Sequence, residues 1–408
     1  MDPLTQALAG MTVARAFPLP EKAPIGPAVW VGLLAASLPD VDVLLPPVVT
    51  GFKPEFMLFH RGWSHTLLVA PLLAALAVVV VRLVRRWGVG EATGTREENK
   101  RLWQIGLAAV AAHLFLDAFN DFGLHLLAPL DPSWRYGDTL YMAEPLLWAA
   151  MLPLAILGAG GRKRRAGWVA VGCLAFGGFG WLMGPAKAIP AVVLAVAVAF
   201  AQRRHDASPV PRFSRVRSFP AVAAVGVVLL AFVLPRFPAR AAVKAALVEG
   251  ATTERLVELS STAAPANPLC WRVVSLSLEV DIFVSREAFV SLAPSFVEPV
   301  ACYPHGTAGR TAPLVPSTVP GHGGLVFKGE FRSNVRELVE SGLDCRIAAA
   351  LSFHRVPLFT RRGHMSLVGD LRYDLTERRS WAELELANSL PKSCPPKIWR
   401  SPLQDVLD

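Results

Sequence analysis

Two histidines stand at the ends of a short polar string, His60-Arg61-Gly62-Trp63-Ser64-His65, that comes just before a long apolar run. Ser64 predicts a helix N-cap, and His65 then falls in the first turn of that helix. His60 lies five residues earlier, so both imidazoles can meet at one point if the chain bends at Gly62. Neutral imidazoles at such a junction suit a transition metal such as zinc. Hydrogen-bonding or interfacial histidines are the alternative interpretation of this pair.

Two further clusters of acids and histidines occur at the ends of other apolar segments. Asp40 and Asp42 follow Pro39, and a proline turn can direct both carboxylates at one cation. His113 and Asp117 are four residues apart, so they share a helix face with their Cβ atoms about 6 Å apart. Polar groups near lipid are costly to desolvate, which favours a function for them. The predicted metal ligands are Asp40, Asp42, His60, His65, His113 and Asp117.

A set of imidazoles and carboxylates of this size predicts a divalent ion, with zinc in first place, as one ion or a pair. Such ions activate water and polarise a phosphoryl or acyl oxygen. Arg135, in the polar connector that follows, is expected to bind a phosphate or to pair with a carboxylate. The alternative is a polar network that ties helix ends together without any metal. The predicted catalytic residues are Asp40, His65, His113, Asp117 and Arg135.

The composition indicates what must position these residues. The chain has 408 residues, of which 53% are hydrophobic, and this is too apolar for an ordinary soluble protein. Apolar residues concentrate before about residue 238, and charges are denser after it. We therefore predict an α-helical polytopic membrane bundle of about seven to eight apolar segments over residues 1–238. A small soluble α+β domain is predicted over residues 239–408.

The distribution of charge predicts an orientation. The formal net charge is +9, and basic clusters lie between apolar runs at residues 82–86, 162–165 and 203–217. The positive-inside rule accounts for these clusters without nucleic-acid binding, which we exclude. We therefore expect a multi-pass protein of the bacterial inner (cytoplasmic) membrane, with membrane lipids as its partners. The predicted metal ligands and the C-terminal domain then lie on the extracytoplasmic side.

The C-terminal half carries the signals of a mixed α+β domain. We expect a helix over residues 241–259 and a strand over residues 274–284, where apolar residues alternate with polar ones. Further alternation after residue 367 predicts an antiparallel sheet, and residues 387–408 are expected to form a tail. Four cysteines lie in this half and would pair in an oxidising compartment. They are Cys270, Cys302, Cys345 and Cys394.

Taken in order, five motifs resemble the YdjM-like family of inner-membrane proteins assigned as metal-dependent hydrolases, which is distantly similar to zinc-dependent phospholipases C. The resemblance covers about residues 1–160 and implies the same six metal ligands. Gln6 departs from it, because the family usually has a histidine there, and this puts the number of ions and the activity in question. The motifs are Met1-Asp2-Pro3-Leu4-Thr5, Leu38-Pro39-Asp40-Val41-Asp42, residues 60–66, His113-Leu114-Phe115-Leu116-Asp117 and Arg135-Tyr136-Gly137-Asp138-Thr139-Leu140.

Three functions are compatible with these observations. The first is a membrane hydrolase that cleaves a phosphoester or ester bond of a lipid or envelope substrate with metal-activated water. The second is a transporter of a metal or small solute, because intramembrane acids and histidines also line ion paths. The third is a non-catalytic membrane anchor whose outer domain binds a partner, and Gln6 is the argument for it. The gathering of the predicted ligands at one membrane face favours the hydrolase.

Overall fold

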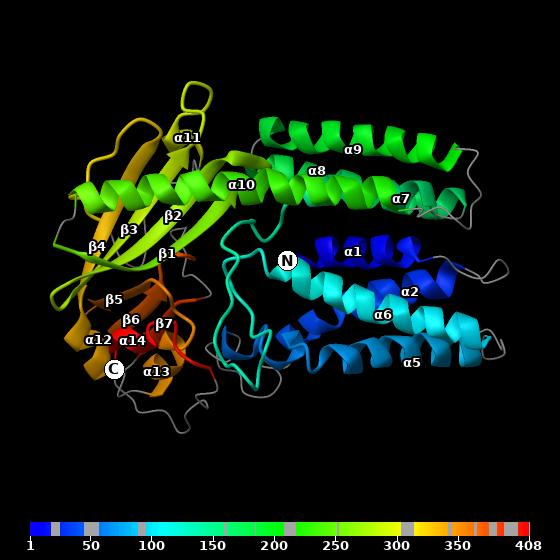
Figure 1. The fold of residues 1–408 in the computed structure, drawn as a ribbon, viewed down its shortest axis with the longest axis horizontal. Helices are drawn as coiled ribbons and strands as arrows, with labels where there is room; N and C mark the ends of the chain where they lie inside the picture. The colour runs from blue at the N-terminus through cyan, green and yellow to red at the C-terminus, as the bar shows by residue number, and fades with distance from the viewer. Residues whose placement is uncertain are drawn as a thin grey trace.

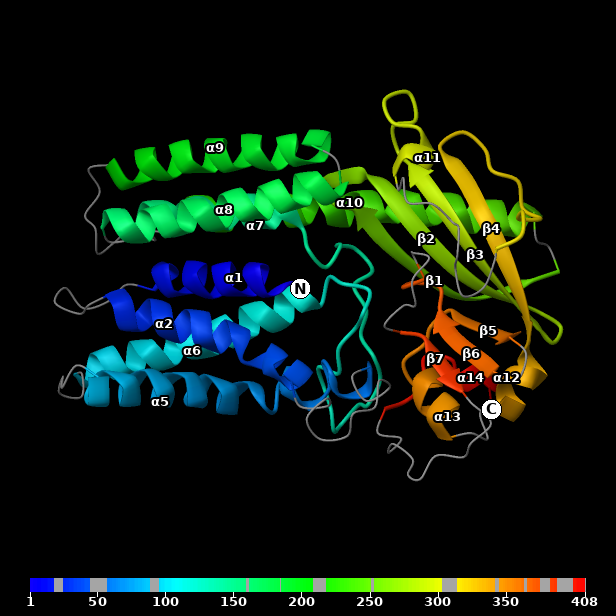
Figure 2. The same cartoon turned by 180° about the vertical axis from the view of Figure 1, so that it is seen from behind.

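The structure, a computed structural model, has a helical region followed by antiparallel sheets (Figure 1). The helices lie side by side at one end of the molecule, and the strands lie at the other, as the reverse view also shows (Figure 2). It describes residues 1–17, 25–44, 57–88, 95–158, 161–183, 185–207, 218–250, 253–302, 314–341, 345–362, 365–374, 382–386 and 399–407.

The helical region forms two packed groups. Helix α1 packs on α2, and α2 packs on α5 and α6, whereas α7 packs on α8, α9 and α10. Two short 3-10 turns, η1 and η2, lie between α2 and α5 in the chain. The elements are α1 (Pro3–Ala16), α2 (Ile25–Ser37), η1 (Pro39–Leu44), η2 (Trp63–His65), α5 (Ala70–Gly88), α6 (Arg96–Asp117), α7 (Pro145–Gly158), α8 (Arg162–Met183), α9 (Pro185–Ala207) and α10 (Phe219–Gly250).

Helix α1 is fixed at its start and at its middle. Asp2 is its N-cap, with a carboxylate that accepts from the backbone N–H groups of Leu4 and Thr5. At its middle, a Cβ added to Gly10 would come within 2.1 Å of the carbonyl oxygen of Gly32 on α2. Only glycine permits so close a backbone approach, so α1 and α2 are locked together at this crossing.

The prediction of seven or eight membrane-spanning segments is wrong. Among the described residues, α10 alone is long and apolar enough to cross a membrane. A second span would result only if the segment Met57–His65 and the helix Ala70–Trp87, bent by 78° at their junction, counted as one. Helices α1, α2 and α7 have 14, 13 and 14 residues, short of the roughly 20 that a span requires.

The apolar character of the shorter helices serves packing within the protein. Helix α7 shows this best, because Leu147, Trp148, Met151 and Leu152 are all buried in the largest hydrophobic core. A buried helix and a lipid-facing helix have the same composition, so hydropathy alone did not distinguish them. The polytopic bundle is therefore replaced by a packed helical region with one clear candidate span.

The predicted antiparallel sheet is present, as two sheets. The first has the strand order β1-β2-β3-β4 and the second the order β5-β6-β7. The C-terminal half of α10 lies across the first sheet (Figures 1 and 2). The elements are β1 (Arg255–Ala264), β2 (Asn267–Glu279), β3 (Ile282–Ser291), α11 (Pro299–Cys302), β4 (Leu325–Asn334), α12 (Val335–Ser341), α13 (Cys345–Leu351), β5 (Pro357–Arg362), β6 (Met365–Asp370), β7 (Leu384–Leu386) and α14 (Gln404–Leu407).

Two predicted elements of this half have different limits in the structure. The helix expected over residues 241–259 ends at Gly250, and β1 begins at Arg255. The strand expected over residues 274–284 is a hairpin that turns at Val280, where φ is 55°. Both strands of the hairpin are buried along most of their length, so the polar residues of the alternation are buried as well. The predicted domain division at residue 238 falls inside α10 and stays a prediction.

Two observations concern the cysteines and the chain end. Cys270 and Cys302 form a disulfide with their Cα atoms 5.3 Å apart, as predicted. Cys345 is also disulfide-bonded, and Cys394 lies outside the described residues. The expected tail is wrong for residues 399–407, because the Trp399 ring is buried and stacks on His125 with ring centroids 3.7 Å apart.

Candidate metal centre

Four of the predicted ligands meet at one point in the helical region. They are Asp40 on η1, His65 on η2, and His113 and Asp117 in the last turns of α6. One ligand atom from each lies within 4.8 Å of the others. Figure 1 places this end of α6 beside the N-terminus, on the side of the helices that faces the sheets.

Local structure explains how each segment reaches this point. Helix α2 ends at Ser37, and Pro39 then begins the 3-10 turn that carries Asp40. The expected N-cap at Ser64 is wrong, because His65 lies on the separate turn η2 and α5 begins only at Ala70. The expected bend is present, with Arg61 in the left-handed region at φ 59°.

The distances within the cluster are those of a coordination sphere. The Nε2 atoms of His65 and His113 lie 3.0 Å apart. They lie 3.2 and 3.3 Å from Oδ2 of Asp117, and 3.4 and 3.6 Å from Oδ1 of Asp40. A tetrahedral zinc ion with bonds of about 2.0–2.1 Å places its ligand atoms roughly 3.3–3.4 Å apart. The four atoms therefore have nearly the separations that a single ion requires.

The hydrogen bonds of the two imidazoles direct their lone pairs at each other. His113 Nδ1 lies 2.7 Å from the carbonyl oxygen of Ala36, so this nitrogen carries the proton. His65 Nδ1 lies 2.9 Å from the hydroxyl oxygen of Ser64, which itself donates to Asp42. In the neutral rings, both Nε2 atoms are then unprotonated and face one another. Such an arrangement is repulsive unless a proton or a metal cation lies between them.

The carboxylates of the cluster are independent evidence for a cation at this point. Oδ1 of Asp40 and Oδ2 of Asp117 are buried and have no hydrogen-bond partner. These are the same two oxygens that face the imidazoles. Buried carboxylate oxygens are nearly always satisfied in proteins, so two orphans at one point indicate a missing cation. The donor set of two nitrogens and two oxygens fits a divalent metal ion.

The structure places Asp42 and His60 behind the cluster. Oδ1 of Asp42 lies 2.8 Å from Nδ1 of His60, and Oδ2 accepts from the backbone N–H of Arg61 at 3.0 Å. The same Oδ2 lies 3.5 Å from Nδ1 of His65. In this position Asp42 orients His65 through its far nitrogen, as carboxylates commonly do for metal-bound histidines.

Replacing Asp42→Asn should weaken metal binding about 10- to 100-fold while leaving the four facing side chains in place. The reason is that an amide holds the Ser64 and His65 hydrogen bonds less firmly than a carboxylate does. Titration of metal-stripped protein with zinc, followed by competition with a chelator, measures the change. Wild-type affinity in this variant would remove Asp42 from the site.

The sequence analysis did not predict the charged and polar groups that surround Asp117. Nη2 of Arg61 lies 3.2 Å from Oδ1 of Asp117, and Nη1 lies 3.2 Å from Oδ1 of Asn120. The N-terminal amino group of Met1 and the side-chain amide of Gln6 also donate to Oδ1 of Asp117. This oxygen is therefore neutralised, while Oδ2 stays available. Asn120 lies three residues after Asp117, just beyond the end of α6, and this closeness in the chain was the only signal for it.

Arg135 does not join this group. Its side chain is 57% exposed and pairs with Asp131 on the connector between α6 and α7. The positive charge next to the cluster belongs to Arg61, which is buried under the Phe122 ring. Arg61 stands inside the polar string of residues 60–66, and this location was the available signal for its role.

The connector also fixes the sheets to the helical region. Arg355 forms a bidentate ion pair with Asp138, with distances of 2.6 and 2.9 Å, and Arg240 on α10 adds a third contact at 3.1 Å. Burial would raise the pKa of Asp138, but the charge of Arg355 outweighs it and holds the pKa below its usual value. Nearby, burial raises the pKa of Glu144 to about 8. The metal-centre side of the helices is thus firmly joined to the sheets.

Access to the cluster is from the side of Asp40. Its side chain is 19% exposed, whereas those of the other three ligands are fully buried. Large apolar side chains next to it in sequence are exposed, among them Val41 at 45% and Leu44 at 63%. Trp63 and Leu67, on either side of His65, are also exposed. Asp40 and His65 are therefore adjacent in the chain to exposed apolar side chains of the kind that contact lipid.

Fold and site together define a protein with a helical region, two antiparallel sheets and a candidate centre for one divalent metal ion. Residues 1–187 match the family of the YdjM inner membrane protein. This confirms the resemblance that the motifs indicated. A second similarity is to the uncharacterized protein YfhP of Bacillus subtilis (strain 168), 26% identical over 136 residues. That match covers 33% of this chain and 38% of YfhP. No solved structure matches the chain.

Proposed function

We propose that this inner-membrane protein is a metal-dependent hydrolase that cleaves a phosphoester or ester bond of a lipid or envelope substrate. One observation carries the proposal. Two imidazole lone pairs and two orphaned carboxylate oxygens meet at one point, on the side chains of Asp40, His65, His113 and Asp117. When bound there, a zinc ion would supply a Lewis acid that lowers the pKa of water and polarises the substrate oxygen.

The residues of the chain have distinct parts in this proposal. His65, His113 and Asp117 are buried and hold the ion in place. Asp40 completes the ligand set through Oδ1 and is the only member of this cluster that water reaches, so its second carboxylate oxygen is placed to accept a proton from the attacking water. Arg61 neutralises Asp117 and adds positive charge for an anionic substrate group. The side-chain oxygen of Gln6 has no hydrogen-bond partner, which leaves it available to a water molecule at the centre.

The exposed apolar groups next to Asp40 and His65 in the chain support a lipid substrate. Val41, Leu44, Trp63 and Leu67 would contact the acyl region while the ester or phosphoester reaches Asp40. The test is release of a water-soluble headgroup from lipid vesicles by purified protein, before and after metal removal with a chelator. Release that depends on added metal supports the proposal, and release that survives complete metal removal contradicts it.

A specific observation keeps a non-catalytic role as a second candidate. Four protein ligands complete a tetrahedron, which is typical of structural metal sites, whereas catalytic sites keep one position open. Gln6 in place of the usual family histidine also favours a non-catalytic role. In this case the metal would stiffen the junction of α6 with the two 3-10 turns. Bound metal with no turnover on any lipid tested would favour this role.

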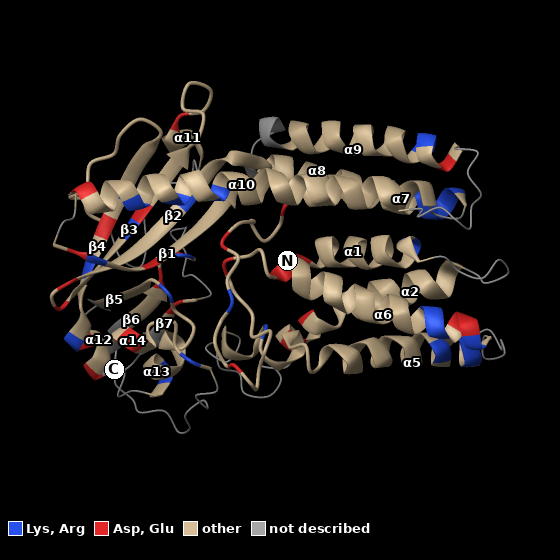
Figure 3. Cartoon of the chain, viewed as in Figure 1, with Lys and Arg blue, Asp and Glu red and all other residues tan. Residues whose placement is uncertain are grey.

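The orientation in the membrane is also a proposal. Basic residues gather at the end of the helices opposite the sheets, including Arg86 of α5, Arg162 of α8 and Arg204 of α9 (Figure 3). We propose that this end faces the cytoplasm and that α10 leads to sheets on the extracytoplasmic side. The disulfide between Cys270 and Cys302 suits an oxidising compartment.

Alkaline phosphatase fused after Asp408 should therefore be active, because this reporter folds only outside the cytoplasm. A fluorescent protein that matures only in the cytoplasm, fused at the same residue, is the matched control and should be dark. The opposite pair of results would reverse the orientation.

A further inference from the structure

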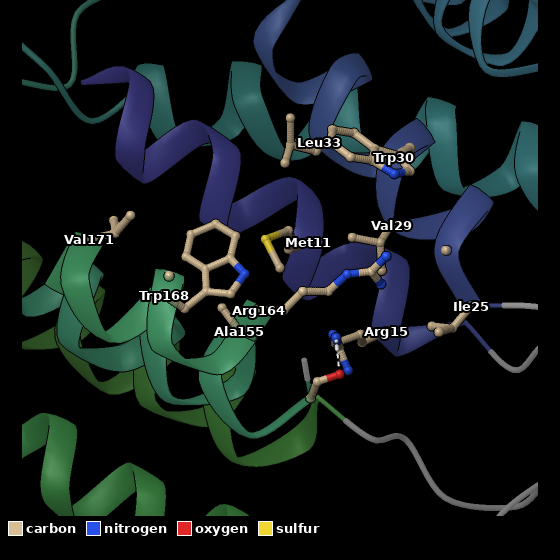
Figure 4. A pocket seen from close by; sticks show the side chains of 13 residues that line it. Met11, Arg15, Ile25, Val29, Trp30, Leu33, Ala155, Arg164, Trp168 and Val171 are labelled. Atoms are coloured by element: carbon tan, nitrogen blue, oxygen red, sulfur yellow. Dashed lines mark hydrogen bonds between the residues drawn. The ribbon is translucent and has the colours of Figure 1, made fainter. Parts of the chain in front are cut away.

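A cavity lies between the two groups of helices, away from the candidate metal centre. Its volume is about 430 Å³, and its walls come from α1, α2, α7 and α8 (Figure 4). Most of its lining is apolar, with Met11, Trp30, Leu33 and Trp168 as the largest groups. Pockets of roughly 300–1,000 Å³ with such linings commonly hold small molecules.

Two arginines provide the charge in this cavity. Arg15 on α1 donates to the carbonyl oxygen of Gly158 at 2.8 Å, which holds its guanidinium at the wall. Arg164, in the first turn of α8, is exposed and extends among the apolar side chains of the lining (Figure 4). The lining residues, all of which the structure describes, include no aspartate or glutamate. The cavity is therefore complementary to a molecule with an apolar body and an anionic head.

The cavity is distinct from the metal centre. Gln6 contacts Asp117 near the start of α1, whereas Arg15 lies nine residues further along the same helix. At 1.5 Å per residue this is a separation of roughly 14 Å. The cavity thus lies toward the basic end of the helices shown in Figure 3. In an inner-membrane protein, that end is where anionic headgroups and arginines meet.

We propose that this cavity binds one anionic phospholipid, with its phosphate against Arg15 and Arg164 and an acyl chain along Met11, Trp30 and Trp168. The proposal rests on the family's place in the inner membrane and on this cavity, and it is independent of hydrolase activity. The lipid would lie between α1, α2, α7 and α8, beside the direct contact of α1 with α7.

The charge of Arg164 is tested with full-length protein in detergent, titrated with phosphatidylglycerol and followed by native mass spectrometry. Arg164→Gln should weaken binding about fivefold, the value expected for one arginine near a lipid phosphate. Arg165→Gln makes the same change of net charge at a neighbouring residue that does not line the cavity, and it should leave binding unchanged. Equal loss in both variants, or equally tight binding of zwitterionic phosphatidylcholine to the wild type, overturns the proposal.

The space inside the cavity is tested with a pair of glycines on α8. A Cβ added to Gly167, which lines the cavity, meets no atom within 4 Å, and the same holds for Gly178, which does not line it. Gly167→Trp should fill the cavity and abolish phosphatidylglycerol binding, whereas Gly178→Trp should retain it. Retention in both variants contradicts the proposal. If Gly167→Trp fails to fold, the comparison of Arg164→Gln with Arg165→Gln decides whether the cavity binds the lipid. Both arginine variants should keep the metal content of the wild type, because neither residue belongs to the metal centre.

Discussion

Substituting His113→Ala should strip the purified protein of its divalent metal, leaving less than about a tenth of the amount that the wild type holds. His113 supplies one of the four ligand atoms, and its Nε2 lies between 3.0 and 3.6 Å from the other three. Alanine removes this nitrogen and leaves two carboxylates and one imidazole. Three ligands bind far more weakly, since even the loss of an outer partner costs about 10- to 100-fold.

Elemental analysis by mass spectrometry, on protein purified without chelators, measures this effect. His205→Ala on α9 is the control, because it removes a histidine outside the cluster and should leave the metal content unchanged. Circular dichroism checks that both variants are folded. Equal metal content in wild type and His113→Ala would show that any bound ion lies elsewhere.

The second large effect is expected in catalysis. Asp117→Asn should lower the release of a soluble headgroup from lipid vesicles by about 100-fold or more, equivalent to roughly 2.7 kcal/mol in activation free energy. Asp117 would offer Oδ2 to a bound metal, while its Oδ1 is held by Arg61 and Gln6. An amide at this position loses a negative ligand and leaves the buried arginine without its carboxylate.

The matched control for this experiment is Arg135→Gln. Sequence reasoning placed Arg135 in the catalytic set, but its exposed side chain pairs with Asp131 instead. This variant should keep activity within about threefold of wild type, as surface substitutions usually do. Full activity in Asp117→Asn would contradict the hydrolase proposal, and loss of activity in Arg135→Gln would restore the role first predicted for that residue.

Much of the candidate site followed from local spacing. His113 and Asp117 share a helix face whenever their segment is helical, and Pro39 forces a turn before Asp40. Which carboxylate of the Asp40 and Asp42 pair faces the cluster depends on how η1 packs against η2, and no spacing in the sequence specifies that. The same packing moved His60 behind the cluster and brought Arg61 beside Asp117.

The fold was less predictable, for two physical reasons. Hydropathy reports that α7 avoids water, but not whether protein or lipid surrounds it, and the structure buries most of this helix in protein. The sequence predicted a separate helix over residues 241–259, yet α10 runs without a break from Phe219 to Gly250, through Pro235 and Pro238. Its C-terminal half is held by packing on the first sheet, a tertiary contact that outweighs local preference.

The measurement that tests the central claim most directly is X-ray absorption at the edge of the metal held by purified, folded wild-type protein. We expect about one ion per chain, bound by nitrogen and oxygen ligands at roughly 2.0–2.1 Å, with the outer-shell scattering of two imidazoles. That result would identify His65 and His113 as a pair on one ion, together with Asp40 and Asp117. Protein that is folded, holds no stoichiometric metal and takes up no added zinc would contradict the claim, and a proton shared between the two histidines would then explain the cluster.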